Sequence, residues 1–326
     1  MPVRVPRSRR AKWSAAAVLA VLALVGGLFL TFNTNTFGPE ELCRGRLSAD
    51  DVRRAFPGAG RLSDKDSEQD RSCTVERTAV GPGTSEVQFS LDVEPESGAF
   101  PFERGTWAMS GSGDIISGAS SGTTGERGGW LLLPSSCAAL ADSAAPASRP
   151  VLRARVWSGT AEPDGLARLL ATAAASLTAE SNCRSNPGEA PGDVLPASAV
   201  SATDTAEVCS LPGFRLAKVT GPKGQSVQER TSGSLDSAWF CDLSFTGDER
   251  NGPFTRLAVV KDPELSVSLK DRRVEKAVCG GKETYFLLDN ADYPWDPKER
   301  AATGFPSEKE LSDLFGRAAR EALDCS

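Results

Sequence analysis

The chain has 326 residues, 40% apolar and 25% charged, a balance typical of globular domains and a length sufficient for two of them. It contains no histidine, which excludes the usual serine-hydrolase triad and zinc sites built on imidazole. The first 38 residues carry five basic side chains and no acid, which leaves 32 basic against 43 acidic residues in the rest. Because binding to phosphate backbones depends on clustered Lys and Arg, this balance argues against nucleic acid as a partner.

An uncharged apolar segment, Ser14–Phe32, follows a basic tail at residues 1–13. As a helix it would span roughly 28 Å, close to the thickness of a bilayer's hydrocarbon core. The positive charges before it place residues 1–13 in the cytoplasm and the rest of a single-pass protein outside the cell membrane. A cleaved signal peptide is the alternative, but no small-x-small cleavage motif ends the segment, so we expect a retained anchor. Residues 33–39 would form a short stalk.

A short capped helix is predicted just beyond the stalk. Ser48 is placed to cap it, Asp51 stands at its third position, and Pro57-Gly58 would end it. Two longer helices are predicted from apolar residues at helical spacing, from Leu166 to Leu177 and from Leu311 to Ala322. Each has an apolar stripe that needs a sheet to cover it.

Strands are predicted where apolar side chains alternate or form short runs. These stretches cover residues 87–93, 151–157, 239–245, 257–260 and 285–288. In both halves of the chain the strands are followed by a closing helix, so we predict an α+β fold.

Eight cysteines without a C-x-x-C pair indicate disulfides in an oxidising compartment rather than a metal site. They form two sets whose first gaps are 30 and 32 residues and whose third gaps are both 46. We therefore predict two tandem copies of an antiparallel-sheet-plus-helix domain, residues 40–183 and 207–326. Residues 184–206, rich in Pro, Ala, Gly and Ser, would be a semi-flexible linker.

The opening of the first copy is CRGRLSADDVRRAFPG from Cys43, followed by SCTV. It resembles the opening of small extracytoplasmic domains in actinobacterial lipoproteins and membrane proteins of unknown function. The resemblance covers residues 41–75 and, more faintly, residues 207–243. It implies a cell-surface module with a disulfide joining Cys43 to Cys73. The second copy departs from it, with no helix predicted after Cys209.

The cysteine gaps also predict a pairing. The middle gap is 26 residues longer in the first copy, whereas the outer gaps are nearly constant. An insertion is tolerated most easily outside a closed loop, although long loops cost little extra entropy. We therefore predict the pairs Cys43–Cys73, Cys137–Cys183, Cys209–Cys241 and Cys279–Cys325.

The extra residues of the first copy form a Gly/Ser-rich insertion at residues 97–130. It contains GASSG at residues 118–122, which satisfies the letters of the G-x-S-x-G nucleophile elbow. That elbow needs a strand before it, a helix after it and a histidine base. We interpret GASSG as a flexible loop and expect no catalysis by Ser120. The apolar residues of the insertion could contact a partner or pack on the domain's own core: Phe100, Phe102, Trp107 and Met109.

An acidic stretch, LDNADYPWDPKER from Leu288, is the second candidate site. Its oxygen-bearing side chains are of the kind that calcium binds, but the EF-hand spacing is absent: Asp289, Asn290, Asp292 and Asp296. We favour a solvated acidic turn without metal, with Tyr293 and Trp295 available to a partner. A carboxylate pair for glycoside hydrolysis stays open, since none of the acids stands out.

These features favour a membrane-anchored extracytoplasmic binding or interaction module without catalytic residues, cofactor or metal. Its partners would be the membrane, through Ser14–Phe32, and an unknown protein or envelope ligand. The residues expected to meet that ligand are Trp107, Met109, Tyr293 and Trp295. An extracytoplasmic enzyme using carboxylate or Ser-Lys chemistry and a sensor-type surface protein are the alternatives. A concave pocket with converging titratable side chains would favour the enzyme.

Overall fold

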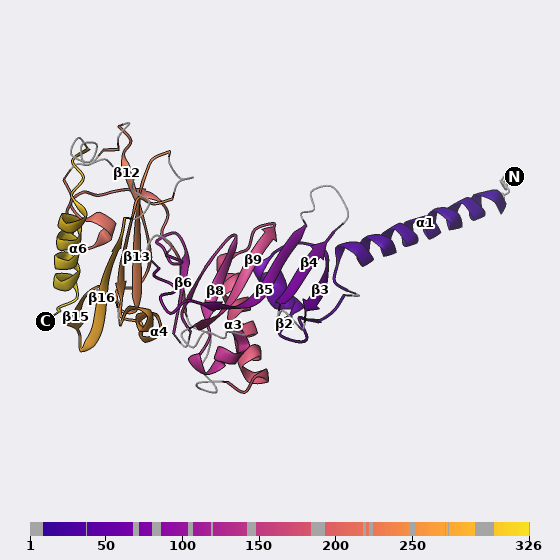
Figure 1. Cartoon of the computed structure of the whole chain (residues 1–326). Helices are drawn as coiled ribbons and strands as arrows, with labels where there is room; N and C mark the ends of the chain where they lie inside the picture. Colours follow the sequence, from indigo (N-terminus) through magenta and orange to yellow (C-terminus); the bar gives the residue numbers. More distant parts are fainter. Residues whose placement is uncertain are drawn as a thin grey trace.

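A computed structural model shows an α+β protein with two large antiparallel sheets, each with one face covered by one or two helices (Figure 1). It describes residues 9–325 except 37, 68–71, 80–85, 104–106, 119, 142–147, 184–192, 218–219, 222–223, 248–251, 271, 273 and 291–302. The α+β class predicted from the sequence is confirmed.

Helix α1 (Arg9–Asn33) contains the apolar segment and projects away from both sheets (Figure 1). Its described apolar side chains are largely exposed, Leu19 by 67% and Leu22 by 62%. Within the described part of the chain, no helix reaches the length and apolar character that crossing a membrane requires. The residues after α1, predicted as a stalk, pack on the first sheet. The Asn35 side chain accepts a hydrogen bond from the Leu62 amide (3.0 Å) and donates one to the Pro39 carbonyl (2.8 Å).

The first sheet has eight strands in the order β10-β6-β7-β8-β9-β5-β4-β3. They are β3 (Arg61–Ser67), β4 (Ser72–Thr78), β5 (Val87–Glu96), β6 (Asp114–Ser117), β7 (Gly122–Gly125), β8 (Gly128–Leu132), β9 (Arg149–Ser158) and β10 (Asp193–Leu195). A small pair, β1 (Glu41–Leu42) and β2 (Leu47–Ser48), precedes helix α2 (Ala49–Ala55), and the 3-10 helix η1 (Ser135–Ala141) precedes β9. Helices α2 and α3 (Pro163–Glu180) cover one face of this sheet.

Local sequence explains the helices of the first unit. The Ser48 hydroxyl caps α2 by accepting a hydrogen bond from the Asp51 amide, as predicted. Pro163 opens α3, where its missing N–H costs no hydrogen bond. The apolar stripe of α3, from Leu166 to Leu177, is buried with the inward side chains of β4, β5 and β9. This is the core that the helical spacing predicts.

The second sheet has six strands in the order β11-β12-β13-β14-β16-β15. They are β11 (Ser201–Ala202), β12 (Val227–Gly233), β13 (Ala238–Phe245), β14 (Thr255–Val260), β15 (Glu275–Cys279) and β16 (Lys282–Asp289). The 3-10 helix η2 (Val208–Ser210) precedes the sheet, and α4 (Pro263–Ser266) and η4 (Val267–Leu269) follow β14. Helix α6 (Glu308–Ala322), capped by Ser307, packs with Leu311 and Phe315 on the face of the sheet that carries Trp239.

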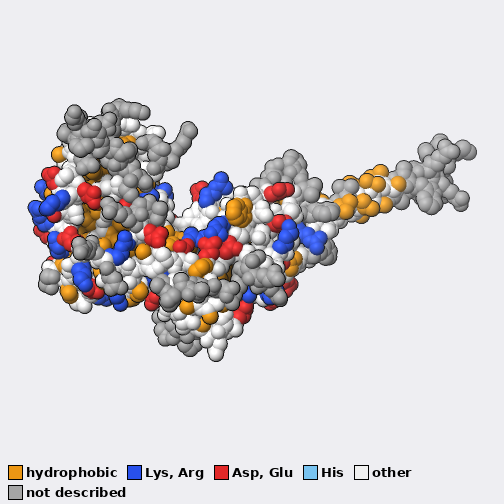
Figure 2. All heavy atoms as spheres, in the orientation of Figure 1, with side chains coloured by type: hydrophobic (Ala, Val, Ile, Leu, Met, Phe, Trp, Pro, Cys, Tyr) orange, Lys and Arg blue, Asp and Glu red, His pale blue; other side chains and the backbone are white. Residues whose placement is uncertain are grey.

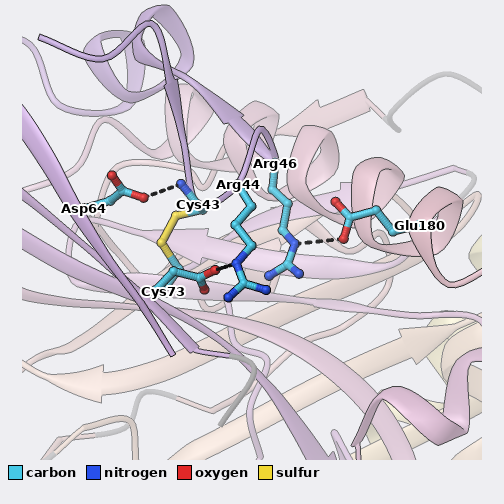
Figure 3. The surroundings of a disulfide bond; sticks show 7 residues. Cys43, Arg44, Arg46, Asp64, Cys73 and Glu180 are labelled. Carbon is cyan, nitrogen blue, oxygen red and sulfur yellow. Dashed lines mark hydrogen bonds and ion pairs between the residues drawn. A yellow bond between two sulfur atoms is a disulfide. The ribbon is translucent and has the colours of Figure 1, made fainter. Parts of the chain in front are cut away.

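The eight cysteines form four disulfides, and these are the pairs that the gaps predict. Figure 3 shows the first of them, Cys43–Cys73, in its surroundings. The Cys43 amide donates to the Asp64 carboxylate (2.7 Å), and Arg46 forms an ion pair with Glu180 at the end of α3 (3.1 Å). The bond therefore joins the loop before α2 to the sheet beside the end of α3.

A third group of buried apolar side chains lies between the two sheets. The first unit contributes Phe100, Phe102, Met109, Ile115, Trp130, Leu132 and Val151. The second contributes Ala238, Phe240, Ala258, Val260, Leu265, Leu269, Tyr285 and Leu287. We call this group the interdomain core. Because dense apolar packing holds two surfaces in a fixed relation, the two units form one body.

The segment predicted as a linker takes part in both sheets. Strand β10 pairs with β6, and β11 pairs with β12, so each adds an edge strand. Between them, the Ala197 amide donates to Asp114 (2.9 Å) and the Ser198 amide to the Thr231 carbonyl (2.7 Å). The composition indicates an extended, semi-flexible segment, but residues 193–202 are fixed, because their backbone groups pair with strand edges that would otherwise be open.

A buried carboxylate lies where the insertion meets the second sheet. Asp242 on β13 is 6% exposed. Burial raises the pKa of its carboxyl to about 6, although hydrogen bonds from the Gly111 amide and Ser110, and the charges of Arg256 and Arg230, act in the opposite direction.

The contribution of this carboxyl to the free energy of unfolding is expected to fall as the pH rises from about 4 to about 6. An unfolded aspartate titrates near its ordinary pKa of 3.8, so between these values the folded protein holds a proton that the unfolded chain has released. The stabilisation is complete below pH 4 and is lost above the folded pKa, a change of about 2–3 kcal/mol. Asp242→Asn should remove this part of the slope in urea unfolding across a pH series. An identical slope in the variant would contradict the assignment.

Candidate binding groove on the first sheet

The aromatic residues of the insertion do not form a free docking surface. Met109 is 1% exposed and Phe102 fully buried, both in the interdomain core. Trp107 is half-buried against Phe102 and lines a cavity of about 790 Å³ beside β16 and α6. The sequence left open whether these apolar residues contact an outside partner or the core of their own domain. In the structure they pack against the second unit of the same chain.

The insertion is also more ordered than its composition suggests. It forms β6, β7 and the start of β8; of the GASSG motif, Gly118, Ser120 and Ser121 lie between β6 and β7, and Gly122 begins β7. Ser121 is fully buried and donates from its hydroxyl to Asp262 of the second unit (2.7 Å). Ser120, the position of the nucleophile in the elbow pattern, is half-buried and is followed by a strand rather than a helix. Ser120 and Ser121 therefore lie in a loop, as predicted, and Ser121 is held in that loop by its hydrogen bond to Asp262.

The acidic candidate site lies mostly outside the described residues, including Tyr293, Trp295, Asp292 and Asp296. Its first two members have protein partners, since Asp289 lies near Arg256 and Asn290 accepts from Thr255 (2.7 Å). In the described ranges, one group brings three potential metal ligands within 4.8 Å of one another: Cys43, Asp64 and Cys73. Those two sulfur atoms are bonded to each other, so the group is a disulfide with a neighbouring carboxylate.

The face of the first sheet that points away from α3 carries an array of charged side chains. Arg153 pairs with Glu94 (2.8 Å) and also with Glu96. Arg155 pairs with Asp92 (3.1 Å) and also with Glu94. We call these five residues the charged ladder. They alternate along β5 and β9 with the inward apolar residues, so the strand period places them all on the outer face.

A tryptophan stands at the end of this ladder. Gln88 pairs with Ser158 and Phe89 with Val156, so Trp157 is the extra residue of a β-bulge in β9. Its side chain is 61% exposed, and its indole N–H donates to the Ser90 hydroxyl (3.3 Å). Bulges commonly re-aim side chains beside functional sites. Here the result is an indole held in place with much of its surface in solvent.

On the other side of the arginines lies a groove of about 490 Å³. Its floor is the β7–β8 hairpin, where Gly125, Gly128 and Gly129 leave the backbone uncovered. A Cβ at Gly128 would lie 2.4 Å from the Ala154 carbonyl oxygen, and its φ of +147° favours glycine. Arg153 and Arg155 form one wall. In Figure 2, basic and acidic side chains lie side by side in the middle of the molecule, over β8 and β9.

Part of this site has a sequence signal. In 92–96 and 153–157, charged residues occupy every second position beside apolar ones, which indicates one solvated face of each strand. Their meeting depends on β5 pairing with β9 across the intervening residues 97–148, and the local pattern contains no information about that pairing.

No protein-family model, curated protein or solved structure matches the chain.

Proposed function

We propose that this protein is an extracytoplasmic binding module, anchored by its N-terminal segment, that binds its ligand on the outer face of the first sheet without catalysing a reaction. The observation that carries the proposal is the combination on that face of a groove, a charged ladder and an exposed indole. Binding sites typically join a concave surface and aromatic side chains to a few fixed polar groups. The carboxylates of the ladder are all engaged by arginines, which suits them to accept hydrogen bonds in a fixed geometry.

The proposed location draws support from the cysteines and from α1. Disulfides persist in oxidising, extracytoplasmic compartments, and all eight cysteines of the chain form them. Residues 14–32 carry no charge, and the described apolar side chains of α1 are exposed rather than packed on either sheet. The basic residues precede this segment, which favours a cytoplasmic N-terminus.

We also infer that the two units are copies of one domain. Strand order supports it, because β3-β4-β5-β9-β8 and β12-β13-β14-β16-β15 follow the same path. In each unit the first cysteine has a positive φ (Cys43 54°, Cys209 59°). The residue just before the last cysteine of each unit also has a positive φ (Asn182 50°, Asp324 49°). Positive φ is uncommon outside glycine, so its recurrence at matched positions favours common descent.

A shared hydrogen bond supports the same inference. The amide of the first cysteine donates to a carboxylate on the first long strand of its sheet, Asp64 in one unit (2.7 Å) and Glu229 in the other (2.9 Å). Burial raises the pKa of Glu229, and the hydrogen bond from Cys209 acts against that rise. An uncommon backbone conformation and its carboxylate partner thus occur together twice.

The binding proposal is tested by site-specific photocrosslinking of the full-length protein in its native membranes. A benzophenone side chain at Glu126, exposed on the rim of the groove, should form defined adducts with envelope material. The matched control is the same side chain at Arg168 on α3, which is also exposed but lies on the opposite face of the sheet. Adducts from Glu126 and not from Arg168 are the expected result. Equal labelling from both positions, or none from Glu126, would overturn the proposal.

A further inference from the structure

We propose that the groove binds a neutral carbohydrate chain, with sugar hydroxyls hydrogen-bonded to the charged ladder and one sugar ring stacked on Trp157. This inference rests on the proposed binding function and names the class of its ligand.

The ladder offers donors and acceptors in alternation. Arg153 and Arg155 donate, Asp92, Glu94 and Glu96 accept, and the side chains are 18–39% exposed. A guanidinium has five N–H donors and a carboxylate about four acceptor sites, so the ion pairs leave hydrogen-bonding capacity unused. A sugar hydroxyl both donates and accepts. Neighbouring hydroxyls of one ring therefore match a surface where fixed donors and acceptors stand side by side.

The charge of the site favours a neutral ligand. The two arginines of the ladder face three carboxylates, and on the groove's rim Glu126 and Arg127 balance each other. The net charge of the site is therefore only −1, which acts only weakly on ions of either sign. A charged ligand would also have to replace ion pairs that already exist, and so would gain little.

Trp157 supplies the apolar part of the site. A sugar ring has an apolar C–H face, and a flat indole is the side chain best shaped to cover it. The hydrogen bond to Ser90 orients the ring, and the strand period that exposes Arg153 and Arg155 places it on the same polar side of the sheet. Because the indole is held before binding, little side-chain entropy is lost when a ligand stacks on it.

An extended peptide fits this surface less well. Peptides that bind to sheets do so mainly by adding a strand to an open edge. Strands β5, β8 and β9 are each paired on both sides, so the site is a sheet face without an open strand edge to which a peptide could add. The floor of the groove is glycine backbone rather than an apolar pocket for a peptide side chain. Its volume of about 490 Å³ lies within the ~300–1,000 Å³ range of small-ligand sites.

The test measures binding of full-length protein, in nanodiscs free of sugar-based detergent, to short neutral glucan, mannan, galactan and arabinan fragments. Wild type should bind at least one fragment with a change in tryptophan fluorescence. Trp157→Ala should weaken that binding about tenfold or more, as expected for an aromatic anchor, and Trp157→Phe should retain most of it. Arg155→Ala should also weaken binding, whereas Arg168→Ala, which removes an exposed arginine on α3, should leave it unchanged.

Two results would overturn the carbohydrate assignment while leaving the binding function intact. One is groove-specific crosslinking from Glu126 to proteins only, with no neutral fragment bound. The other is preferential binding of acidic fragments that weakens with added salt, since screening acts on net charge. Thermal unfolding of each variant establishes that it is folded. If Trp157→Ala does not fold, Trp157→Phe and Arg155→Lys decide the matter, because an unchanged affinity in both would also overturn the proposal.

Discussion

Replacing Gly111 by valine is expected to divide the unfolding of this protein into two transitions. A Cβ at Gly111 would lie 2.1 Å from the Arg230 carbonyl oxygen and 2.9 Å from the Asp242 amide nitrogen, both backbone atoms of the second unit. Backbone cannot yield as a flexible side chain does, so the units must separate at this point. We expect a loss of about 3 kcal/mol in the free energy of unfolding, at the upper end of overpacking effects.

Other contacts between the two units lie next to Gly111, so separating the backbones there should weaken them as well. Ser232 donates to the Ser110 carbonyl (2.9 Å), and the rings of Phe102 and Phe240 stack across the same contact with centroids 6.2 Å apart. Wild type should unfold in one transition by both near-UV circular dichroism and calorimetry. The matched control is Gly125→Ala, because no atom lies within 4 Å of a Cβ there. A single transition with an unshifted midpoint in Gly111→Val would show that the interdomain core does not couple the units.

Removing the Cys209–Cys241 disulfide, by changing both residues to alanine, is expected to cost about 2–4 kcal/mol. The bond joins residues 32 apart in sequence, and both cysteines are fully buried at the centre of the second unit. In the chain-entropy account, the cross-link stabilises by restricting the unfolded chain. Without it, the strained backbone at Cys209 (φ 59°) also loses its covalent attachment to β13.

The measurement is chemical unfolding of the double variant against wild type, with Trp239, which stacks on Phe315 in the second core, as one reporter. The comparison variant lacks Cys137–Cys183, where Cys183 is only half-buried and lies in the first unit. Loss of that bond should also lower the unfolding midpoint, because the two units unfold together, but it leaves the Cys209 backbone attached to β13. An unchanged midpoint in the Cys209 and Cys241 variant would mean that packing alone fixes this segment.

Local pattern predicted much of the secondary structure. The cap at Ser48, the stripe of α3 and the cap of α6 at Ser307 are all as the spacing indicates, since each depends on residues within a few positions of one another. The interdomain core also had a signal. β5 alternates apolar and polar residues, whereas Ala238–Leu243 and Leu257–Val260 are apolar at nearly every position. A strand of that kind has both faces buried, so its second face needs a cover.

That the insertion packs on the second sheet could not be predicted from such patterns. The apolar residues of the insertion are scattered among Gly and Ser, and their packing on the second unit depends on contacts more than a hundred residues apart. The bulge at Trp157 is equally non-local. It exists only because β5 has one residue fewer than β9 over the same span, and the run 151–157 alone indicates an ordinary strand.

The interdomain core has a consequence for how many ligands one chain can carry. Doubling a domain usually doubles its sites, and avidity then follows from the pair. Here the second sheet's face on β13, β14 and β16 that corresponds to the ladder side of the first sheet is apolar and is buried against the insertion and against Leu132 and Val151 of the first sheet. In the described part of the molecule, the same face of the first sheet is buried only in part, at Trp130, Leu132 and Val151, and is exposed at the charged ladder and Trp157. The chain should therefore be monovalent, and any avidity for a repeating ligand must come from the density of chains on the surface that bears them.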